Sequence, residues 1–116
     1  MKPFDPDKYN FTDSIITKIE YDADSDELLV LIDCFQGKDD SIELRLKLKG
    51  IKELTIHKNS IGVTDDKWSA LSVSNISKTV AGENIHIVIE PIISFIPGHE
   101  NDAPILNCVC EKAFAE

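Results

Sequence analysis

Apolar and polar residues alternate along several segments of the chain, which is the pattern of a β-strand with one buried face. Residues 41–49 place Ile and Leu at every second position, with Ser, Glu, Arg and Lys between them. Residues 84–89 repeat the pattern with isoleucine, and residues 14–21 carry Ile15, Thr17, Ile19 and Tyr21 on one side. Residues 28–35 are apolar at every position except Asp33, which predicts a central strand covered on both faces.

Three further segments predict strands: residues 51–58, 70–77 and 104–114. The connections at 22–26, 36–40 and 49–50 are short and rich in turn residues, so we expect antiparallel hairpins there. Pro91 and Pro97 bracket residues 92–96 and favour an edge strand for them. Asp5 followed by Pro6 predicts one helical turn over residues 5–9.

Together these elements predict a mainly β fold with minor helix, formed as one domain over residues 1–116. We expect about seven antiparallel strands in a single, strongly curled sheet, barrel-like or packed as a sandwich. A curled sheet is favoured because both faces of residues 28–35 need to be covered.

The charge of the chain narrows the classes of partner. Of its 116 residues, 12 are Lys or Arg and 21 are Asp or Glu, which gives a net charge of −9 at pH 7. Arg45 is the only arginine. This balance argues against nucleic acid and against an anionic membrane surface. The first residues lack the apolar stretch of a signal peptide, and no apolar run could cross a bilayer, so a cytoplasmic location is expected.

Cysteine and histidine offer little for chemistry. Cys108 and Cys110 are two residues apart, so in a strand both side chains point to one face, and we expect both in the core beside an unpaired Cys34. Half of a metal or redox site is the alternative, although structural zinc needs four ligands. His57, His86 and His99 are isolated and are expected in ordinary structural or surface roles. No cofactor and no bound metal are predicted.

Catalytic motifs are not found in the sequence, and the protein is not expected to be an enzyme. Asp22, Asp24 and Asp26 suggest a calcium loop, but its sixth and twelfth positions hold Glu27 and Asp33 instead of Gly and Glu. A solvated hairpin turn is therefore expected. Asp33, inside the most apolar run, is the one acid for which burial or a functional role stays open.

The positions of the acids point to a binding surface. If the strands formed a simple up-and-down meander, one end of the sheet would gather Asp39, Asp40, Asp65, Asp66, Glu100 and Asp102. The other end would hold Asp22, Asp24, Asp26, Glu27 and Glu83. Trp68, the only tryptophan, lies beside the first group, where it could anchor a partner or close the core. The predicted partner-binding residues are Asp39, Asp40, Asp65, Asp66 and Trp68.

Three segments resemble small bacterial β domains found among immunity proteins of toxin systems and among uncharacterised families: residues 11–16 (FTDSII), 49–54 (KGIKEL) and 110–113 (CEKA). The resemblance implies a small, acidic, cytosolic protein that binds and blocks a toxin domain, with no catalytic residue. The expected function is thus a non-enzymatic protein-binding domain that masks the active site of a basic toxin domain such as a nuclease. Two alternatives stay open: an oligomerising structural β domain, and a metal-binding domain using Cys108 and Cys110. The oligomeric state is not predicted.

Overall fold

Seven strands form a single antiparallel sheet in the computed structural model, which describes residues 2–11, 14–35, 41–56, 72–91 and 104–116. The strands are β1 (Lys2–Pro3), β2 (Ser14–Asp22), β3 (Glu27–Phe35), β4 (Ser41–Ile56), β5 (Ser72–Ala81), β6 (Asn84–Pro91) and β7 (Leu106–Ala115). The predicted mainly β fold with one curled antiparallel sheet is confirmed. The predicted helical turn is also present, as the 3-10 helix η1 (Pro6–Lys8). Asp5 caps it, because its side chain accepts a hydrogen bond from the backbone N–H of Asp7 at 3.1 Å.

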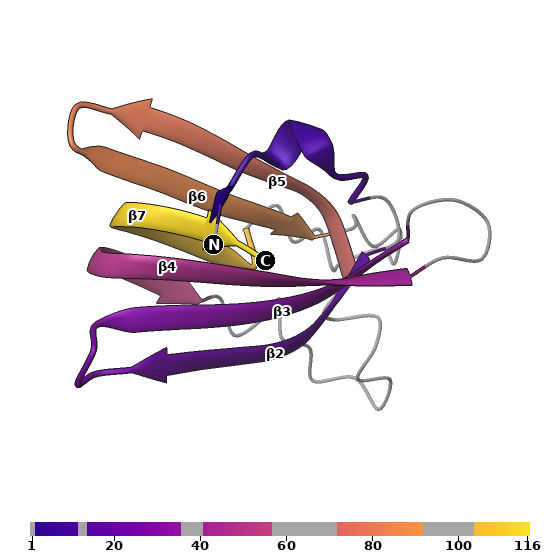
Figure 1. The fold of residues 1–116 in the computed structure, drawn as a ribbon, viewed down its shortest axis with the longest axis horizontal. Coiled ribbons are helices and arrows are strands. Elements are labelled where there is room, and N and C mark those ends of the chain that lie inside the picture. Colours follow the sequence, from indigo (N-terminus) through magenta and orange to yellow (C-terminus); the bar gives the residue numbers. More distant parts are fainter. Residues whose placement is uncertain (1, 12–13, 36–40, 57–71, 92–103) are drawn as a thin grey trace, which may run out of the picture.

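The sheet closes into a ring. Its strand order is β1-β7-β4-β3-β2-β5-β6, and β6 pairs in addition with β7. The junction between β2 and β5 is short, since only Ser14–Val73 and Ile15–Ser72 are paired. Beyond this junction the two strands diverge toward opposite sides of the molecule (Figure 1). The assumption of a simple meander is therefore wrong: β4 lies beside β7, and β2 lies beside β5.

Gly50 lies inside a strand and not in a hairpin turn. The sequence predicted two strands joined at residues 49–50, but β4 is one strand of 16 residues. It pairs with β3 as far as Lys49 and with β7 from Leu46 to Ile56, with a bulge between Ile51 and Glu53. Gly50 adopts a positive φ of 67°, and Figure 1 shows the strand bending sharply in this region. Glycine permits such a backbone in a bend as readily as in a turn, so local sequence could not distinguish the two.

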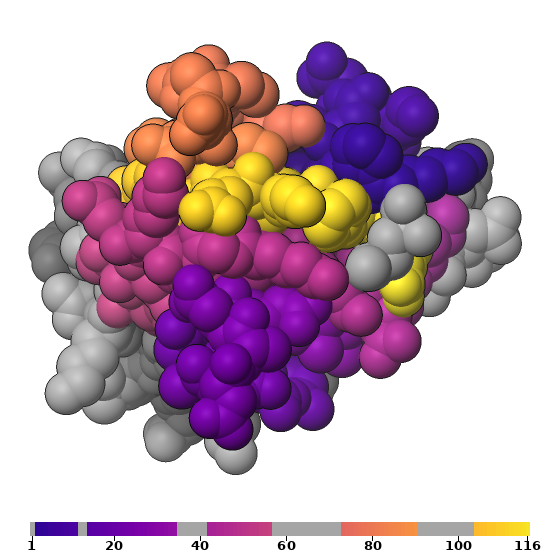
Figure 2. Space-filling model, turned by 60° about the vertical axis from the view of Figure 1, so that its left-hand side comes forward, coloured from indigo at the N-terminus to yellow at the C-terminus, as the bar shows by residue number. Residues whose placement is uncertain are grey.

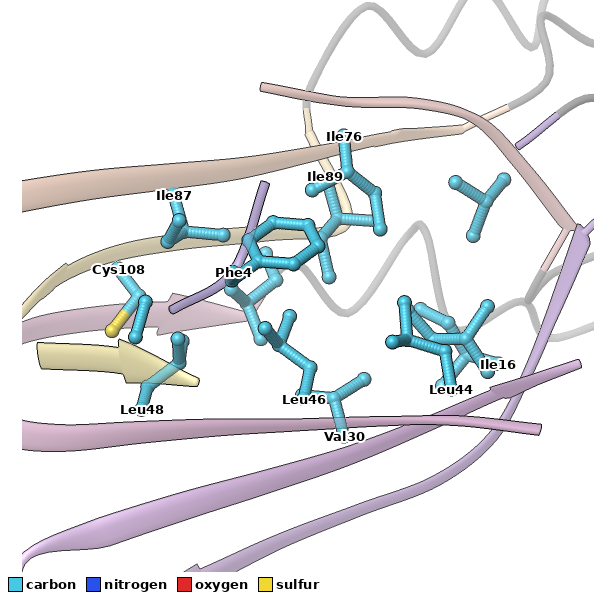
Figure 3. Close-up of a cluster of buried hydrophobic side chains, with 14 of the residues drawn as sticks. Phe4, Ile16, Val30, Leu44, Leu46, Leu48, Ile76, Ile87, Ile89 and Cys108 are labelled. Carbon is cyan, nitrogen blue, oxygen red and sulfur yellow. The ribbon is translucent and has the colours of Figure 1, made fainter. Parts of the chain in front are cut away.

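The core lies between the facing strands, and a residue of the N-terminal segment fills its middle. Figure 3 shows Phe4 between Ile76, Ile87 and Ile89 on one side and Leu46 and Val30 on the other. All of these side chains are buried. Complete burial of one such side chain contributes about 1.5–3 kcal/mol. The N-terminal segment is therefore an integral part of the core, a role that its sequence did not predict.

The central strand β3 is fully covered on one face only. Leu28, Val30, Ile32 and Cys34 are buried, whereas Leu29, Leu31 and Asp33 on the other face are half-buried. The expectation of complete cover on both faces is thus wrong for the outer face. The predicted edge strand at residues 92–96 lies outside the described residues.

Candidate functional site

The five predicted partner-binding residues, Asp39, Asp40, Asp65, Asp66 and Trp68, lie outside the described residues. The same holds for Glu100 and Asp102, and for His57 and His99. The structure does, however, place the strand ends that flank the segments carrying them. Those flanking residues define where each segment is attached.

Strand ends flanking residues 36–40, 57–71 and 92–103 lie along one rim of the ring. Phe35 at the end of β3 pairs with Ser41 at the start of β4. Two residues earlier on β3, Asp33 pairs with Ile15 of β2. The adjacent residue Ser14 pairs with Val73, which in turn pairs with Pro91. Leu106 pairs with both Ile89 and Ile56. We call this set the segment rim: Ser14, Phe35, Ser41, Ile56, Val73, Pro91 and Leu106.

The opposite end of the ring, the hairpin rim, is formed by residues 22–27, 49–52, 81–85 and 110–112. Asp22 pairs with Glu27, which pairs with Lys49, and Lys49 pairs with Lys112. Lys52 closes the rim, because its amine donates to Asn84 Oδ1 at 2.7 Å. Figure 2 shows the β2–β3 hairpin in purple and the β5–β6 hairpin in orange, with β4 and β7 between them.

The second group of acids, Asp22, Asp24, Asp26, Glu27 and Glu83, belongs to the hairpin rim, as the sequence predicted despite the different strand order.

The turn at residues 22–27 is held by hydrogen bonds of its own carboxylates. Asp22 Oδ1 accepts from the backbone N–H of Asp24 at 2.9 Å, and Asp26 Oδ1 accepts from the Tyr21 hydroxyl at 2.9 Å. The hydrogen bond with Asp26 raises the pKa of Tyr21, and the negative charges of Asp26 and Asp22 add to this effect. Glu27 pairs with Lys49 at 3.7 Å. These interactions hold three of the carboxylates of the acidic turn in place.

The three cysteines are core residues. Cys34, Cys108 and Cys110 are free and fully buried, which confirms the prediction that Cys108 and Cys110 point together into the core. A hydrogen bond with Cys110, together with burial, raises the pKa of the Cys108 thiol, and burial raises that of Cys34. Within the described part of the chain, no group of three or more His, Cys, Asp or Glu side chains is placed to hold a metal ion.

The surroundings of His86 and Asp33 indicate structural roles for both residues. A ring nitrogen of His86 on β6 hydrogen-bonds to the Asn107 side chain on β7, which joins two paired strands. Asp33 is half-buried on the outer face of β3, opposite Ile15 on one side and Glu43 on the other. The alternation of the strand thus keeps this carboxylate out of the core.

A depression of about 390 Å³ lies between η1 and β5, and no pattern in the sequence predicted it. Residues of both elements line it, among them Asp7, Asn75, Lys78 and Val80. The Lys78 amine donates to the Phe4 carbonyl at 2.8 Å and so ties the N-terminal segment to β5. Figure 2 shows this segment, in indigo, lying beside β7.

The sequence matches no protein-family model, and no curated protein sequence is similar to it at a significant level. No helix in the described residues has the length and apolar character needed to span a membrane.

Proposed function

We propose that this chain is a non-enzymatic protein-binding domain of the immunity type, which neutralises a basic toxin domain such as a nuclease by masking its active site. The observation that supports the proposal is the segment rim. Three segments carry Asp39, Asp40, Asp65, Asp66, Glu100 and Asp102, and each is covalently attached at both ends to this one rim.

The charge of these segments gives the proposal its physical basis. Their six acids stand against three lysines, and the whole chain has a net charge of −9. An acidic surface raises the rate of encounter with a basic protein, and it repels nucleic acid that would compete for the same partner. A nuclease domain must carry positive charge where it holds phosphate. Trp68, within the longest of the three segments, supplies an aromatic anchor of the kind that dominates binding energy.

The test begins by capturing the partner with the full chain and identifying it by mass spectrometry. The association rate of the pair is then measured over a series of salt concentrations. The variant Asp39→Lys/Asp40→Lys/Asp65→Lys/Asp66→Lys should associate more slowly and with a weaker dependence on salt. Addition of the wild-type chain should abolish the catalytic activity of the captured partner.

A matched control reverses four exposed acids away from the segment rim: Asp7, Asp24, Glu53 and Glu83. This variant has the same net charge as the first, so any effect of total charge appears in both. The proposal requires the first variant to lose much more of the association rate. A partner without a basic surface, or equal losses in the two variants, would contradict it.

A further inference from the structure

Among the described residues, the outer edge of β2 is unpaired along most of its length. β2 pairs with β3 from Ile15 to Asp22, with a bulge between Ile16 and Lys18 and regular pairing from Lys18 to Asp22, but on its other side it pairs with β5 only at Ser14 and Ile15. No strand in the described residues lies beside the remainder of that edge, residues 16–22, and Figure 1 shows β2 as the outermost strand on its side of the molecule. Unpaired backbone groups along such an edge can hydrogen-bond to a strand of another chain.

We propose that two copies of this chain pair through their β2 edges, antiparallel and with a twofold axis at Ile19. This arrangement places Lys18 of each copy opposite Glu20 of the other. The two side chains are on the outer face and about half-exposed, and within one chain they already form an ion pair at 2.9 Å. Across the dimer they form two further pairs of opposite charge, which stabilise neighbouring strands.

The charge pattern selects this register over its neighbours. A twofold axis at Lys18 would place that lysine opposite itself, and an axis at Glu20 would place the two glutamates opposite each other. Shifts by a single residue would move core-facing side chains to the outer face. Near the middle of the edge, the register with its axis at Ile19 is thus the one in which Lys18 and Glu20 each face a residue of opposite charge.

The inner face of the edge also fits a second copy. Tyr21 pairs with the buried Leu28, so it lies on the core-facing side, yet 49% of it is exposed because β5 has diverged from β2. Ile19 is on the same side and is only partly buried. In the proposed register Ile19 meets Ile19 across the twofold axis, so a second copy covers part of the apolar surface that the ring leaves exposed at Ile19 and Tyr21.

The experiment is sedimentation velocity on the full chain, from the micromolar to the near-millimolar range. The wild-type chain should shift from its mass of 13.0 kDa toward twice that mass as concentration rises. Lys18→Glu creates two like-charge pairs and should weaken association about tenfold or more. Glu20→Lys should do the same. A mixture of the two single variants should associate, because each lysine then meets a glutamate, and the double exchange Lys18→Glu/Glu20→Lys should restore the wild-type behaviour.

Arg45→Glu is the matched control. Arg45 forms an ion pair at 4.0 Å with Glu43, two residues away on the outer face of β4. Arg45→Glu therefore replaces a cation by an acid, as Lys18→Glu does. Its strand has neighbours on both sides, since Arg45 pairs with Leu31 and exchanges backbone hydrogen bonds with Glu116. This variant should associate like the wild type.

A wild-type chain that stays monomeric throughout, or association that Lys18→Glu leaves unchanged, would overturn the proposal. So would single variants that fail to associate when mixed, once circular dichroism shows that they are folded. None of these measurements involves a toxin domain, so their outcome is independent of the function proposed above.

Discussion

Replacement of Gly50 by alanine tests whether the bend of β4 depends on close contact with β7. Gly50 has a φ of +67°, a conformation that residues with a Cβ rarely adopt. A Cβ at this position would lie 2.8 Å from Glu111 Oε2 and 2.9 Å from Glu111 Cβ. The flexible carboxylate can turn away, but the Cβ of Glu111 cannot, because the pairs Lys49–Lys112 and Ile51–Cys110 fix the β7 backbone on both sides.

The expected loss has two parts. The positive φ costs about 1–2 kcal/mol for an L-residue, and the reduced entropy of the unfolded chain offsets roughly 0.4–1 kcal/mol of it. Overpacking against Glu111 adds about 1–3 kcal/mol. Gly82 separates the two parts, because its φ of +62° is similar but no atom lies within 4 Å of its ideal Cβ position. Gly50→Ala should therefore lower the free energy of unfolding by about 1–3 kcal/mol more than Gly82→Ala.

Urea denaturation of the two variants and the wild type, followed by circular dichroism, measures this difference. A double-mutant cycle with Glu111→Gly then tests whether this difference arises from the contact with Glu111. Removal of the Glu111 side chain should recover most of the additional loss of stability in Gly50→Ala. Equal losses for Gly50→Ala and Gly82→Ala would refute the reasoning. So would an additional loss at Gly50 that Glu111→Gly leaves unchanged.

Three further predictions concern the core and the acidic turn. Phe4→Ala should destabilise the chain by roughly 3–5 kcal/mol, measured by thermal unfolding, whereas Val80→Ala, at a position that is 64% exposed, should change stability by less than about 0.5 kcal/mol. Because the hydrogen bond with Asp26 raises the pKa of Tyr21, the stability it contributes is present below the unfolded pKa of about 10 and is lost as pH rises through the folded value. Phenolate absorbance should show one of the two tyrosines ionising late, and Asp26→Asn should bring that ionisation to lower pH. Burial of the three thiols predicts that a bulky disulfide reagent modifies none of them at about pH 8 until urea unfolds the chain.

Patterns within one segment predicted most strands well, because alternation is a local property. The single face predicted for Ile15, Thr17, Ile19 and Tyr21 is wrong, since a bulge between Ile16 and Lys18 leaves Ile15 on the outer face and puts Ile19 and Tyr21 on the inner face. Residues 41–49 and 84–89 show the alternation most clearly, and their inward positions are buried, apart from Ile42 and Ile85 near the strand ends. The burial of Cys108 and Cys110 followed from the same period of two. Asp5 and Pro6 gave the helical turn, since both residues act on the backbone next to them.

Contacts between distant segments were not predictable from these patterns. Phe4 stands between Pro3 and Asp5 in a segment with no periodicity, so nothing in its surroundings indicated that it fills the core. Its position depends on β1 pairing with β7, about 110 residues along the chain, and on the Lys78 amine. The pairing of residues 46–56 with 106–115 likewise joins the two halves of the chain. The predicted partner-binding residues lie outside the described residues and stay a prediction.

The two proposals use different surfaces, and the distribution of charge explains why they are compatible. Acidic residues gather at the hairpin rim, and acid-bearing segments are attached to the segment rim, so two copies meeting end to end would repel each other. The side of the ring at β2 differs, because Lys18 and Glu20 balance each other there. Two copies joined along this side keep both rims of each copy accessible. A dimer should therefore hold two partner molecules, and Lys18→Glu should weaken dimerisation while one partner still binds each chain with unchanged affinity. Loss of partner affinity in that variant would show that the β2 edge and the partner-binding surface overlap.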